Sequence, residues 1–369
     1  MKVLVTGAKG FVGKNLTTQL RSNGCHEIYE YDLDTEKSLL DEYTKDSEFV
    51  FHLAGVNRPE NESGFMEGNY GFTAELIDAM KKNCNKSPIL MTSSIQADHD
   101  NPYGRSKRAG EDLIFEYGRE IGAGVYCYRL PNLFGKWSKP YYNSVVATFC
   151  HNISRDIEIT VNDPDKFLPL CYIDDVVEEF LKALAGDPSV SGKFCFVPVE
   201  YSIKLSDLAY LIKSFRKSRY DLRLPDMKDD LTRKLYSTYL SYIPKEDLAY
   251  DLLMHKDDRG SFTEFIKMQD GSQVSVNIAK PGITKGNHWH MSKNEKFLVV
   301  NGKGMIRSRD LNTGEVAEFK VSGERLEIVD IPPGWTHSIT NVGSVDMVTI
   351  IWVNETYDPN RPDTFFMEV

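Results

Sequence analysis

The hydrophobic pattern of the chain changes part-way along, and this change constrains the possible folds more than any other feature. In the first half, short apolar runs alternate with segments of helical periodicity. We predict helices at residues 73–82 and 105–121, and another that ends at Leu20. The predicted strands between them are residues 2–6, 27–31, 49–53, 89–92 and 124–128. Strands that alternate with helices form parallel sheets through right-handed crossovers, so we predict an α/β domain with a parallel sheet.

From Gly260 onward the helical periodicity disappears. Short alternating segments, interrupted by glycine and proline, take its place, which is typical of an antiparallel sandwich or barrel. The predicted strands are residues 273–278, 295–300, 304–308, 325–331 and 345–353. A chain of 369 residues fits two or three domains, at roughly 150 residues each. We place the boundary between residues 243 and 250, which gives domains of residues 1–245 and 246–369.

The composition argues against several classes of protein. The net charge is −10 and the pI is about 5.4, and an acidic chain without a basic block is not expected to bind nucleic acid. The six cysteines lie within the first 195 residues without a CxxC pair, which favours buried free thiols in a reducing compartment. The chain opens directly into a strand, and no apolar run approaches the length of a membrane span. We therefore expect no membrane association and a cytoplasmic location.

A glycine-rich segment, Thr6–Gly13, follows the first predicted strand and opens a helix. Its glycines, Gly7, Gly10 and Gly13, allow a tight turn in which the backbone can approach a pyrophosphate. The unpaired N–H groups and the positive dipole end of the helix then favour the phosphates. An ordinary turn between a strand and a helix is the alternative, but the position after the first strand favours dinucleotide binding.

Two nearby residues leave the identity of the dinucleotide open. Asp32 follows the second predicted strand, where a carboxylate usually accepts hydrogen bonds from the adenine ribose of NAD. It lies beside Asp34 and Glu36, so a solvated turn residue is an equally good interpretation. Lys9, inside the glycine loop, could instead bind the 2′-phosphate of NADP.

Tyr103 and Lys107 are four residues apart at the start of a predicted helix, so they lie on one face of it. An ammonium near a phenol favours the phenolate, which lowers the tyrosine pKa from about 10. Tyr103 could then exchange a proton with a carbonyl oxygen, and Lys107 could also hold the nicotinamide ribose. Ser93 and Ser94 end a strand shortly before, where a hydroxyl would hold the substrate oxygen beside Tyr103.

These features resemble the extended short-chain dehydrogenase/reductase family, which has a Rossmann-like doubly wound sheet and often acts on nucleotide sugars. The resemblance makes Ser94, Tyr103 and Lys107 the catalytic residues. One departure is Ile95–Asp98, where the family often has Val-Tyr-Gly after its serine, so the substrate-facing loop is unusual. The matching segments are Thr6–Gly13, residues 52–55, Asn69, Ser93 and Ser94, Tyr103–Lys107, residues 129–135 and residues 171–176. The implied cofactor-binding residues are Gly7, Lys9, Gly10, Phe11, Val12, Gly13, Asp32, Leu53, Ala54, Gly55, Tyr103, Lys107 and Asn132.

A histidine-rich pattern dominates the second half: Gly282-x5-His288-x-His290-x4-Glu295-x6-Gly302. On a strand, His288 and His290 point to the same face, and Glu295 and His337 could converge on them from neighbouring strands. Three imidazoles and a carboxylate suit a divalent transition metal. The alternative is a set of surface histidines.

This pattern resembles the cupin family, an all-β jelly-roll barrel with a metal inside. The second cupin motif, around His337, departs from the family because Leu326 occupies a position where glycine is expected, with Gly323 nearby. Residues 258–264 are also similar to a segment of sugar-nucleotide epimerase cupins, in which an arginine binds the diphosphate, although the spacing is one residue shorter.

The two halves together closely resemble the bifunctional enzymes of capsular polysaccharide synthesis, and this resemblance covers essentially the whole chain. It implies a UDP-linked 4-keto-6-deoxy-N-acetylhexosamine as substrate, C3 epimerisation in the cupin and NADPH-dependent C4 reduction to a UDP-2-acetamido-2,6-dideoxy-talose type product. It also implies NADPH rather than NADH, one Zn²⁺ and a homodimer. Two alternatives stay open. One is an epimerase or dehydratase with tightly bound NAD and a structural cupin, and the other is a cupin sensor fused to a degenerate reductase.

Overall fold

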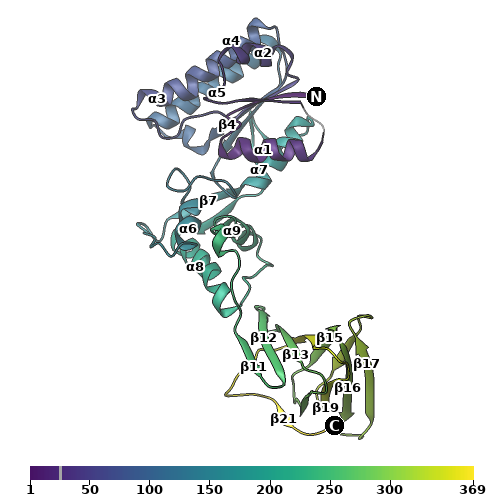
Figure 1. The fold of residues 1–369 in the computed structure, drawn as a ribbon. Helices are drawn as coiled ribbons and strands as arrows, with labels where there is room; N and C mark the ends of the chain where they lie inside the picture. The colour runs from purple at the N-terminus through teal and green to yellow at the C-terminus, as the bar shows by residue number, and fades with distance from the viewer. Residues whose placement is uncertain (25–26) are drawn as a thin grey trace. The chain divides into compact units, whose positions relative to one another are not determined.

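The computed structural model describes residues 1–24 and 27–369 and divides them into two compact units (Figure 1). The first unit comprises Met1–Ile212 and Lys234–Ile243, and the second comprises Lys213–Arg233 and Pro244–Val369. The chain therefore passes from one unit to the other within α8 (Leu205–Asp221), within α9 (Asp230–Leu240) and again after Ile243. The single domain boundary at residues 245/246 stays a prediction.

The sheet of the first unit has the strand order β2-β1-β3-β4-β5-β9-β8. Neighbouring strands are parallel from β2 to β9, and the edge strand β8 is antiparallel to β9. The predicted parallel α/β sheet is thus confirmed. Its strand order reverses at β1, and ligands of doubly wound sheets bind at the carboxyl ends of the strands at such a point. The strands are β1 (Lys2–Thr6), β2 (Glu27–Tyr31), β3 (Phe49–His52), β4 (Ile89–Ser94), β5 (Val125–Leu130), β8 (Val190–Ser191) and β9 (Phe194–Cys195).

Helices cover both faces of this sheet (Figure 1). Consecutive side chains of a strand point to opposite faces, so Val3 and Val5 belong to one buried cluster and Leu4 to another. α1 (Phe11–Ser22) and α7 (Ile173–Leu184) contribute to the first cluster. α2 (Ser38–Asp46), α4 (Phe72–Lys82) and α5 (Pro102–Ile121) contribute to the second. Burial on both faces explains why the strands are continuous apolar runs.

Several elements of the first unit were not predicted from the sequence. A small mixed sheet has the order β10-β7-β6, with β6 parallel and β10 antiparallel to β7. Two short helical turns flank the predicted catalytic residues, the π-helical η1 and the 3-10 helix η2. These elements are β6 (Asn132–Phe134), β7 (Phe167–Tyr172), β10 (Tyr201–Lys204), α3 (Ser63–Phe65), α6 (Val145–Ile153), η1 (Met66–Gly71), η2 (Ile95–Asp98), together with α7, α8 and α9.

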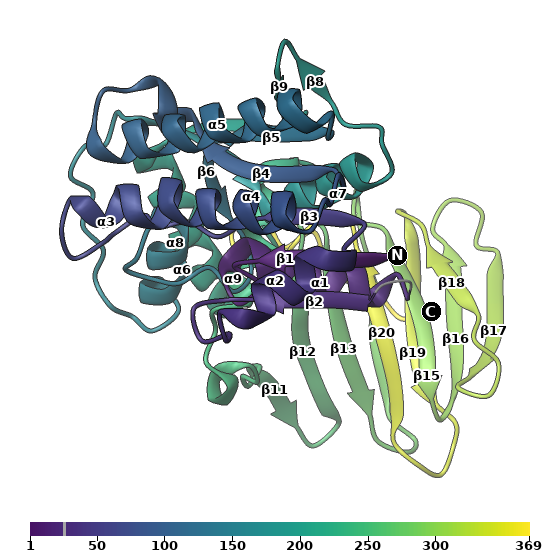
Figure 2. The same cartoon turned by 90° about the horizontal axis from the view of Figure 1, so that it is seen from above.

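The second unit contains two antiparallel sheets, with the orders β11-β12-β13-β20-β15-β18 and β17-β16-β19-β14-β21 (Figure 2). The predicted all-β character is confirmed, although the strand predicted at residues 325–331 begins only at Ile328. The elements are η3 (Lys245–Asp247), β11 (Met254–Asp257), β12 (Gly260–Lys267), β13 (Gln273–Ala279), β14 (Thr284–Trp289), β15 (Glu295–Asn301), β16 (Lys303–Asp310), β17 (Val316–Ser322), β18 (Ile328–Ile331), β19 (Trp335–Asn341), β20 (Met347–Val353) and β21 (Phe365–Phe366).

The cysteines and the helices bear on the predictions drawn from composition. Five cysteines are free; Cys127, Cys150, Cys171 and Cys195 are buried, whereas Cys84 is exposed, contrary to the expectation of burial. Cys25 lies outside the described residues. Within residues 1–24 and 27–369, none of the helices combines the length and the apolar character that crossing a bilayer requires.

Candidate functional site

The glycine loop after β1 leaves no room for side chains at two of its positions. Gly7 adopts a left-handed backbone (φ 68°), and a Cβ there would lie 2.8 Å from the backbone nitrogen of Ala54. A Cβ on Gly13 would lie 2.2 Å from the carbonyl oxygen of Gly7. The loop therefore packs directly against Leu53–Gly55, the segment that follows β3. These segments adjoin the point where the strand order reverses, as a dinucleotide site requires.

Asp32 and Lys9 lie at the same end of this loop. The Asp32 carboxylate accepts hydrogen bonds from the backbone N–H groups of Lys9 (2.7 Å) and Leu33 (2.8 Å). The Lys9 ammonium forms an ion pair with Asp34, and both side chains are more than half exposed. An exposed ion pair of this kind is weak because water screens it, so a phosphate can displace the Asp34 carboxylate. The structure thus offers a carboxylate and an exchangeable ammonium after β2, where dinucleotide-binding folds hold the adenine ribose.

Tyr103 and Lys107 occupy successive turns of α5, on one face, as their spacing predicts. Asn101 caps the helix by accepting a hydrogen bond from the Gly104 N–H (2.8 Å). A Cβ on Gly104 would lie 2.3 Å from the carbonyl oxygen of Gln96. The first turn of α5 is consequently pressed against η2, the segment that follows Ser94.

The titration behaviour of this pair differs from the prediction. Burial raises the pKa of Tyr103 above its ordinary value, and a hydrogen bond with Ser94 opposes the shift. The direction is opposite to the one expected from an ammonium nearby, because burial of the phenol outweighs the other influences. Burial also lowers the pKa of Lys107 to about 8, and its ammonium donates to the carbonyl oxygen of Thr92 (3.1 Å). Without a cofactor, the site therefore favours a neutral phenol and holds its proton.

Asn69 connects the segment that follows β3 with helix α5. Its side-chain amide accepts from the Val56 N–H (2.9 Å) and donates to the Val56 carbonyl (3.0 Å) and to the Ser106 hydroxyl (2.9 Å). Ser106 in turn donates to the carbonyl oxygen of Tyr103 (2.8 Å). The sequence predicts Asn69 only as part of the family resemblance. In the structure its side chain, from η1, holds Val56 and Ser106 in place.

A buried ion pair behind the site was missed by the sequence analysis. The Arg129 guanidinium donates to both carboxylate oxygens of Glu111, at 2.9 and 2.6 Å, and the Glu111 side chain is 1% exposed. Ser93, which precedes the predicted catalytic residue Ser94, donates to the same carboxylate. Arg129 also donates to Asp98 at the end of η2 (2.6 Å). The sequence carries no signal for this pair, because Arg129 and Glu111 belong to different elements and their separation matches no period of regular structure.

Asn132, a predicted cofactor-binding residue, lies on β6 and is exposed, and its amide donates to the carbonyl oxygen of Pro169 (3.0 Å). Phe11 and Val12 begin α1 directly after the glycine loop. Gly55 approaches the catalytic helix, since a Cβ there would lie 3.1 Å from the Lys107 ammonium.

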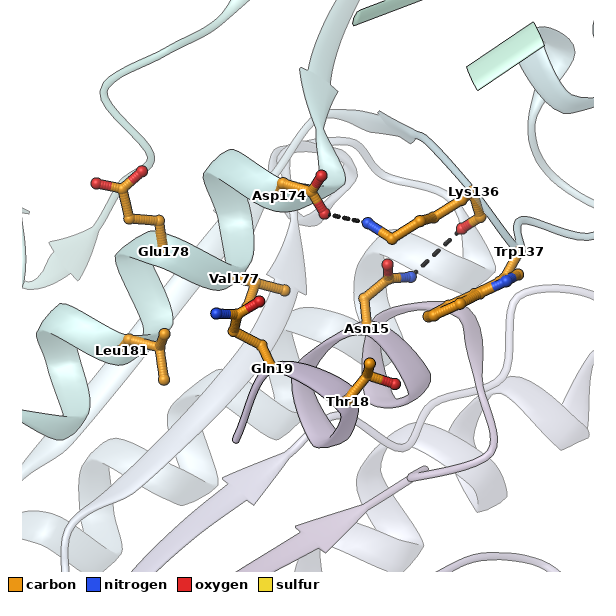
Figure 3. Close-up of a pocket in the computed structure, with 9 residues that line it drawn as sticks. All are labelled: Asn15, Thr18, Gln19, Lys136, Trp137, Asp174, Val177, Glu178 and Leu181. Atoms are coloured by element: carbon orange, nitrogen blue, oxygen red, sulfur yellow. Dashed lines mark hydrogen bonds and ion pairs between the residues drawn. The ribbon is translucent and has the colours of Figure 1, made fainter. Parts of the chain in front are cut away.

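A pocket of about 260 Å³ lies between α1 and α7, lined also by Lys136 and Trp137 (Figure 3). Lys136 pairs with Asp174 across it. Asn15 donates to the carbonyl oxygens of Phe11 (2.9 Å) and Lys136 (3.4 Å), while its own side-chain oxygen is buried without a hydrogen-bond partner among the described residues. None of the lining residues is a predicted site residue, so this pocket is separate from the Ser94–Tyr103–Lys107 group.

In the second unit, the structure brings together all four predicted metal ligands. One potential ligand atom from each of His288, His290, Glu295 and His337 lies within 4.8 Å of the others. His288 belongs to β14 and pairs with His337 in β19, and Glu295 begins β15 in the facing sheet. His290 lies just beyond the end of β14, whose register shifts between Gly286 and His288.

The chemistry of this cluster fits a metal ion. The Nε2 atoms of His290 and His337 and the Oε2 atom of Glu295 are buried without hydrogen-bond partners among the described residues. Nε2 of His337 approaches Oε2 of Glu295 to 3.0 Å without the geometry of a hydrogen bond. Burial lowers the pKa of His288 to about 4, which leaves its ring neutral. Buried polar atoms are rarely left unpaired, so lone pairs that converge in this way indicate the ligands of a divalent ion.

The interior beside this cluster is polar on one side. Gln273, Ser275 and Asn277 alternate along β13 with partly exposed apolar residues, and all three are buried; we call them the polar strip. Gln273 pairs with Val353, which pairs with Glu295, so the polar strip faces the same interior as the ligands. The side-chain oxygens of Gln273 and of Thr349, which pairs with Asn277, are buried and without hydrogen-bond partners in the described chain.

The structure also describes the two other cupin-like segments of the sequence, one at Leu326 and one at Arg259. Leu326 is exposed, and Gly323 is the glycine that lies close to the backbone, since a Cβ there would be 2.5 Å from the carbonyl oxygen of Val300. Arg259 lies in the turn between β11 and β12 and donates to Asp257 through two nitrogens.

Comparison with known proteins covers both units. Residues 3–193 match the model of the NAD dependent epimerase/dehydratase family, and residues 255–365 match the polysaccharide biosynthesis C-terminal domain. The chain belongs to the NAD dependent epimerase/dehydratase family. A Pseudomonas aeruginosa protein named UDP-2-acetamido-2,6-beta-L-arabino-hexul-4-ose reductase is 47% identical over 100% of this chain and 99% of its own length.

Solved structures extend this similarity. The capsular polysaccharide assembling protein CapF from Staphylococcus aureus is 53% identical, with a TM-score of 0.95 and complete coverage of both chains. The predicted resemblance to bifunctional capsular polysaccharide enzymes is therefore confirmed over the whole chain. A UDP-glucuronic acid 4-epimerase from Bacillus cereus is 18% identical, with a TM-score of 0.56, over 68% of this chain and all of its own. At that identity the likeness concerns the fold alone.

Proposed function

We propose that the chain is a bifunctional nucleotide-sugar enzyme that epimerises C3 of a UDP-linked 4-keto-6-deoxy-N-acetylhexosamine and then reduces C4 with NADPH. The observation that carries the proposal is that one chain contains the Ser94–Tyr103–Lys107 group and a four-residue metal cluster. That chain is similar over its whole length to a protein named as a UDP-sugar reductase. We assign it to the synthesis of capsular polysaccharide precursors, as a homodimer.

In the first unit, Tyr103 is the proton donor to the C4 oxygen, and Ser94 holds that oxygen beside it. The raised pKa of Tyr103 suits this direction, because a reduction needs the phenol rather than the phenolate. Lys107 would hold the nicotinamide ribose. It also returns a proton to Tyr103 after the phenol has given its own to the C4 oxygen. Gly7–Gly13 would hold the pyrophosphate of NADPH and Lys9 its 2′-phosphate, and the bound cofactor would supply the hydride.

In the second unit, His288, His290, Glu295 and His337 would hold one Zn²⁺. A bound ion of this type supplies Lewis-acid polarisation of a carbonyl, which acidifies the neighbouring proton. The polar strip offers hydrogen-bond partners to the hydroxyl and amide groups of the sugar. Epimerisation precedes reduction, because the C4 ketone is what makes the C3 proton acidic.

A structural metal is the competing function of the second unit, paired with an epimerase or dehydratase that keeps its NAD. The observation in its favour is the ligand set itself, because zinc held by four protein ligands is often structural.

One experiment separates these possibilities. The purified protein is incubated with the 4-keto nucleotide sugar and NADPH in D₂O, with absorbance at 340 nm reporting reduction and mass spectrometry reporting deuterium at C3. We expect His290→Ala to stay folded, to lose exchange at C3 and to reduce pre-epimerised substrate normally. Loss of one melting transition in this variant would instead support a structural metal. Normal exchange in a folded, metal-free variant would refute both functions of the cluster.

A further inference from the structure

The last residues of the chain run along the metal cluster. We call Pro362–Glu368 the C-terminal strap; it includes β21, which pairs with β14 so that Phe366 lies opposite His288 and Phe365 opposite Trp289. Next to this pairing, the backbone N–H of Met367 donates to the carbonyl oxygen of Asn287 (2.9 Å). The strap is therefore an added strand on the one that bears the ligand His288.

The strap also reaches the other two histidine ligands. Nδ1 of His290 lies 2.5 Å from the carbonyl oxygen of Asp363. The hydroxyl of Thr336, the residue before His337, donates to the carbonyl oxygen of Met367. Three histidines from separate places in the sequence thus share one neighbouring segment.

Asp363 makes the densest set of these contacts. Its carboxylate accepts hydrogen bonds from the backbone N–H groups of Met291 (2.8 Å), Ser292 (3.0 Å) and Lys293 (3.0 Å), and from the Ser292 hydroxyl (3.0 Å). These donors form the turn that directly follows His290. The carboxylate of Asp363 thus pairs with three successive backbone N–H groups of this turn.

The backbone of Asp363 is itself held in an unfavourable conformation. Its φ is 40°, in the left-handed region that residues with a side chain seldom adopt. The buried Lys293 ammonium donates to the carbonyl oxygen of the preceding residue, Pro362 (2.5 Å). A strained backbone persists where the surrounding contacts determine it, and here those contacts all belong to the turn after His290.

The contact with His290 fixes the state of its ring. When Nδ1 donates its proton to the carbonyl oxygen of Asp363, Nε2 carries the lone pair, and Nε2 is the atom that faces Glu295. A partner of this kind on the far nitrogen sets the tautomer and the orientation of a metal-binding imidazole. The carboxylate of Asp363 keeps that carbonyl oxygen in place by anchoring the turn.

We propose that Asp363 is a positioning residue for the metal site, and that the C-terminal strap is required to retain the ion. This inference rests on the proposed metal-binding function of His288, His290, Glu295 and His337. Nothing in the sequence pattern of the ligands includes Asp363, which follows His290 by 73 residues.

The test uses the full-length protein with Asp363→Asn, which keeps the size of the side chain but turns one acceptor into a donor facing N–H groups. Zn²⁺ affinity is measured by competition with a chromophoric chelator, and melting curves are recorded with and without Zn²⁺. We expect the dissociation constant to rise about 10–100-fold, the usual effect of removing a partner of a ligating residue. The melting temperature of the metal-free protein should change little, while the increase that Zn²⁺ produces should shrink.

A matched control and a milder variant keep the result decisive. Asp358→Asn alters an exposed carboxylate shortly before the strap, one that accepts a hydrogen bond from the local N–H of Asn360 (2.9 Å), and this variant should bind Zn²⁺ like the wild type. If Asp363→Asn fails to fold, Ser292→Ala is the milder variant. It removes a single hydrogen bond to Asp363 and should still weaken the binding of Zn²⁺ measurably.

The outcomes are distinguishable. Equal Zn²⁺ affinity in the wild type and in a folded Asp363→Asn protein would overturn the positioning role while leaving the metal site intact. Equal losses of melting temperature with and without Zn²⁺ would likewise reduce Asp363 to a structural residue. A wild-type protein that binds no divalent ion would refute the metal site and this inference together.

Discussion

Replacing Arg129 by methionine should destabilise the first unit strongly, because it leaves a buried carboxylate without its partner. The Glu111 side chain is 1% exposed, and Arg129 supplies two of its hydrogen bonds, at 2.9 and 2.6 Å. In Arg129→Met, the hydroxyl of Ser93 is the remaining described donor to Glu111. Removing one partner of a buried ion pair costs about 3–5 kcal/mol, since the charge left behind has lost both water and its counter-ion.

Two smaller effects act in the same direction. The guanidinium lies 4.0 Å above the ring of Phe194, a cation–π contact worth about 1 kcal/mol when partly exposed. The pair with Asp98 is exposed on the carboxylate side and adds less than about 1 kcal/mol. We therefore expect a loss of about 5 kcal/mol, which lowers the melting temperature of a unit of this size by roughly 10–20 °C.

Thermal melts followed by circular dichroism measure this loss, and the transition of the first unit is the one that NADPH raises. Arg105→Met is the matched control, because Arg105 pairs with the exposed carboxylates of Asp100 and Glu62 and should cost less than about 1 kcal/mol. Adding Glu111→Gln to Arg129→Met should restore most of the stability by removing the unpaired charge. A drop below about 4 °C in Arg129→Met would show that water or rearrangement satisfies Glu111, and would refute the reasoning.

The remaining predictions concern the two chemistries. Tyr103→Phe should lower the reductase rate at least about 100-fold while NADPH binding, measured by fluorescence titration, stays nearly unchanged; retention of a tenth of the rate would exclude Tyr103 as the acid. NADPH should give a higher kcat/KM than NADH, and Lys9→Ala should make this difference smaller. Equal kcat/KM values for the two cofactors in the wild type would assign the adenine ribose to Asp32 alone. Because burial lowers the pKa of Lys107 to about 8 from 10.5, the unfolded chain binds more protons between those values. Wild-type stability in urea should then rise with pH across that window relative to Lys107→Met, by up to about 3 kcal/mol, and a flat difference would mean that Lys107 is effectively solvated. Gln273→Leu should slow deuterium exchange at C3 about tenfold through loss of a sugar contact without changing C4 reduction of pre-epimerised substrate, and unaltered exchange would remove Gln273 from the sugar site.

The strands of the parallel sheet were predictable because both of their faces are buried, which makes them continuous apolar runs. α7 was equally predictable in principle. Its buried residues Ile173, Val177, Phe180 and others recur at helical spacing. The sequence analysis uses this segment only for the family resemblance and predicts no helix there. The missed small elements of the first unit, such as β6 and β10, are three or four residues long, too short for any periodicity to stand out.

β14 and β19 are not among the strands that apolar alternation predicts, and only the ligand pattern indicates a strand at His288 and a neighbouring one at His337. β14 reads Thr-Lys-Gly-Asn-His-Trp, and the inward positions of both strands carry His288 and His337 rather than aliphatic residues. A strand whose inner face binds a metal loses the alternation of apolar and polar residues by which strands are predicted. The same histidines make the ligand set predictable from the sequence. They also remove the apolar alternation from the two strands that carry them.

Residues that act through a partner distant in sequence could not be predicted in this way. Tyr103 and Lys107 are related by helical spacing, and His288 and His290 by their proximity. Arg129 of β5 reaches Glu111 of α5, and Asp363 reaches His290 across 73 residues of sequence. Only the tertiary fold brings these together, because their separations match no period of regular structure.

The electrostatics of the first unit suit the proposed reductase more directly than the NAD-retaining alternative. An enzyme that begins by oxidising its substrate needs Tyr103 as a base, so its phenol must already be ionised. Burial raises the pKa of Tyr103 in the protein alone, and a bound cofactor must reverse that shift before an oxidation can start. The nicotinamide of an oxidised cofactor carries a positive charge that favours the phenolate, whereas the reduced nicotinamide of NADPH is neutral. In the proposed NADPH complex, Tyr103 would keep the proton that the C4 oxygen needs, which is the direction that a reductase requires.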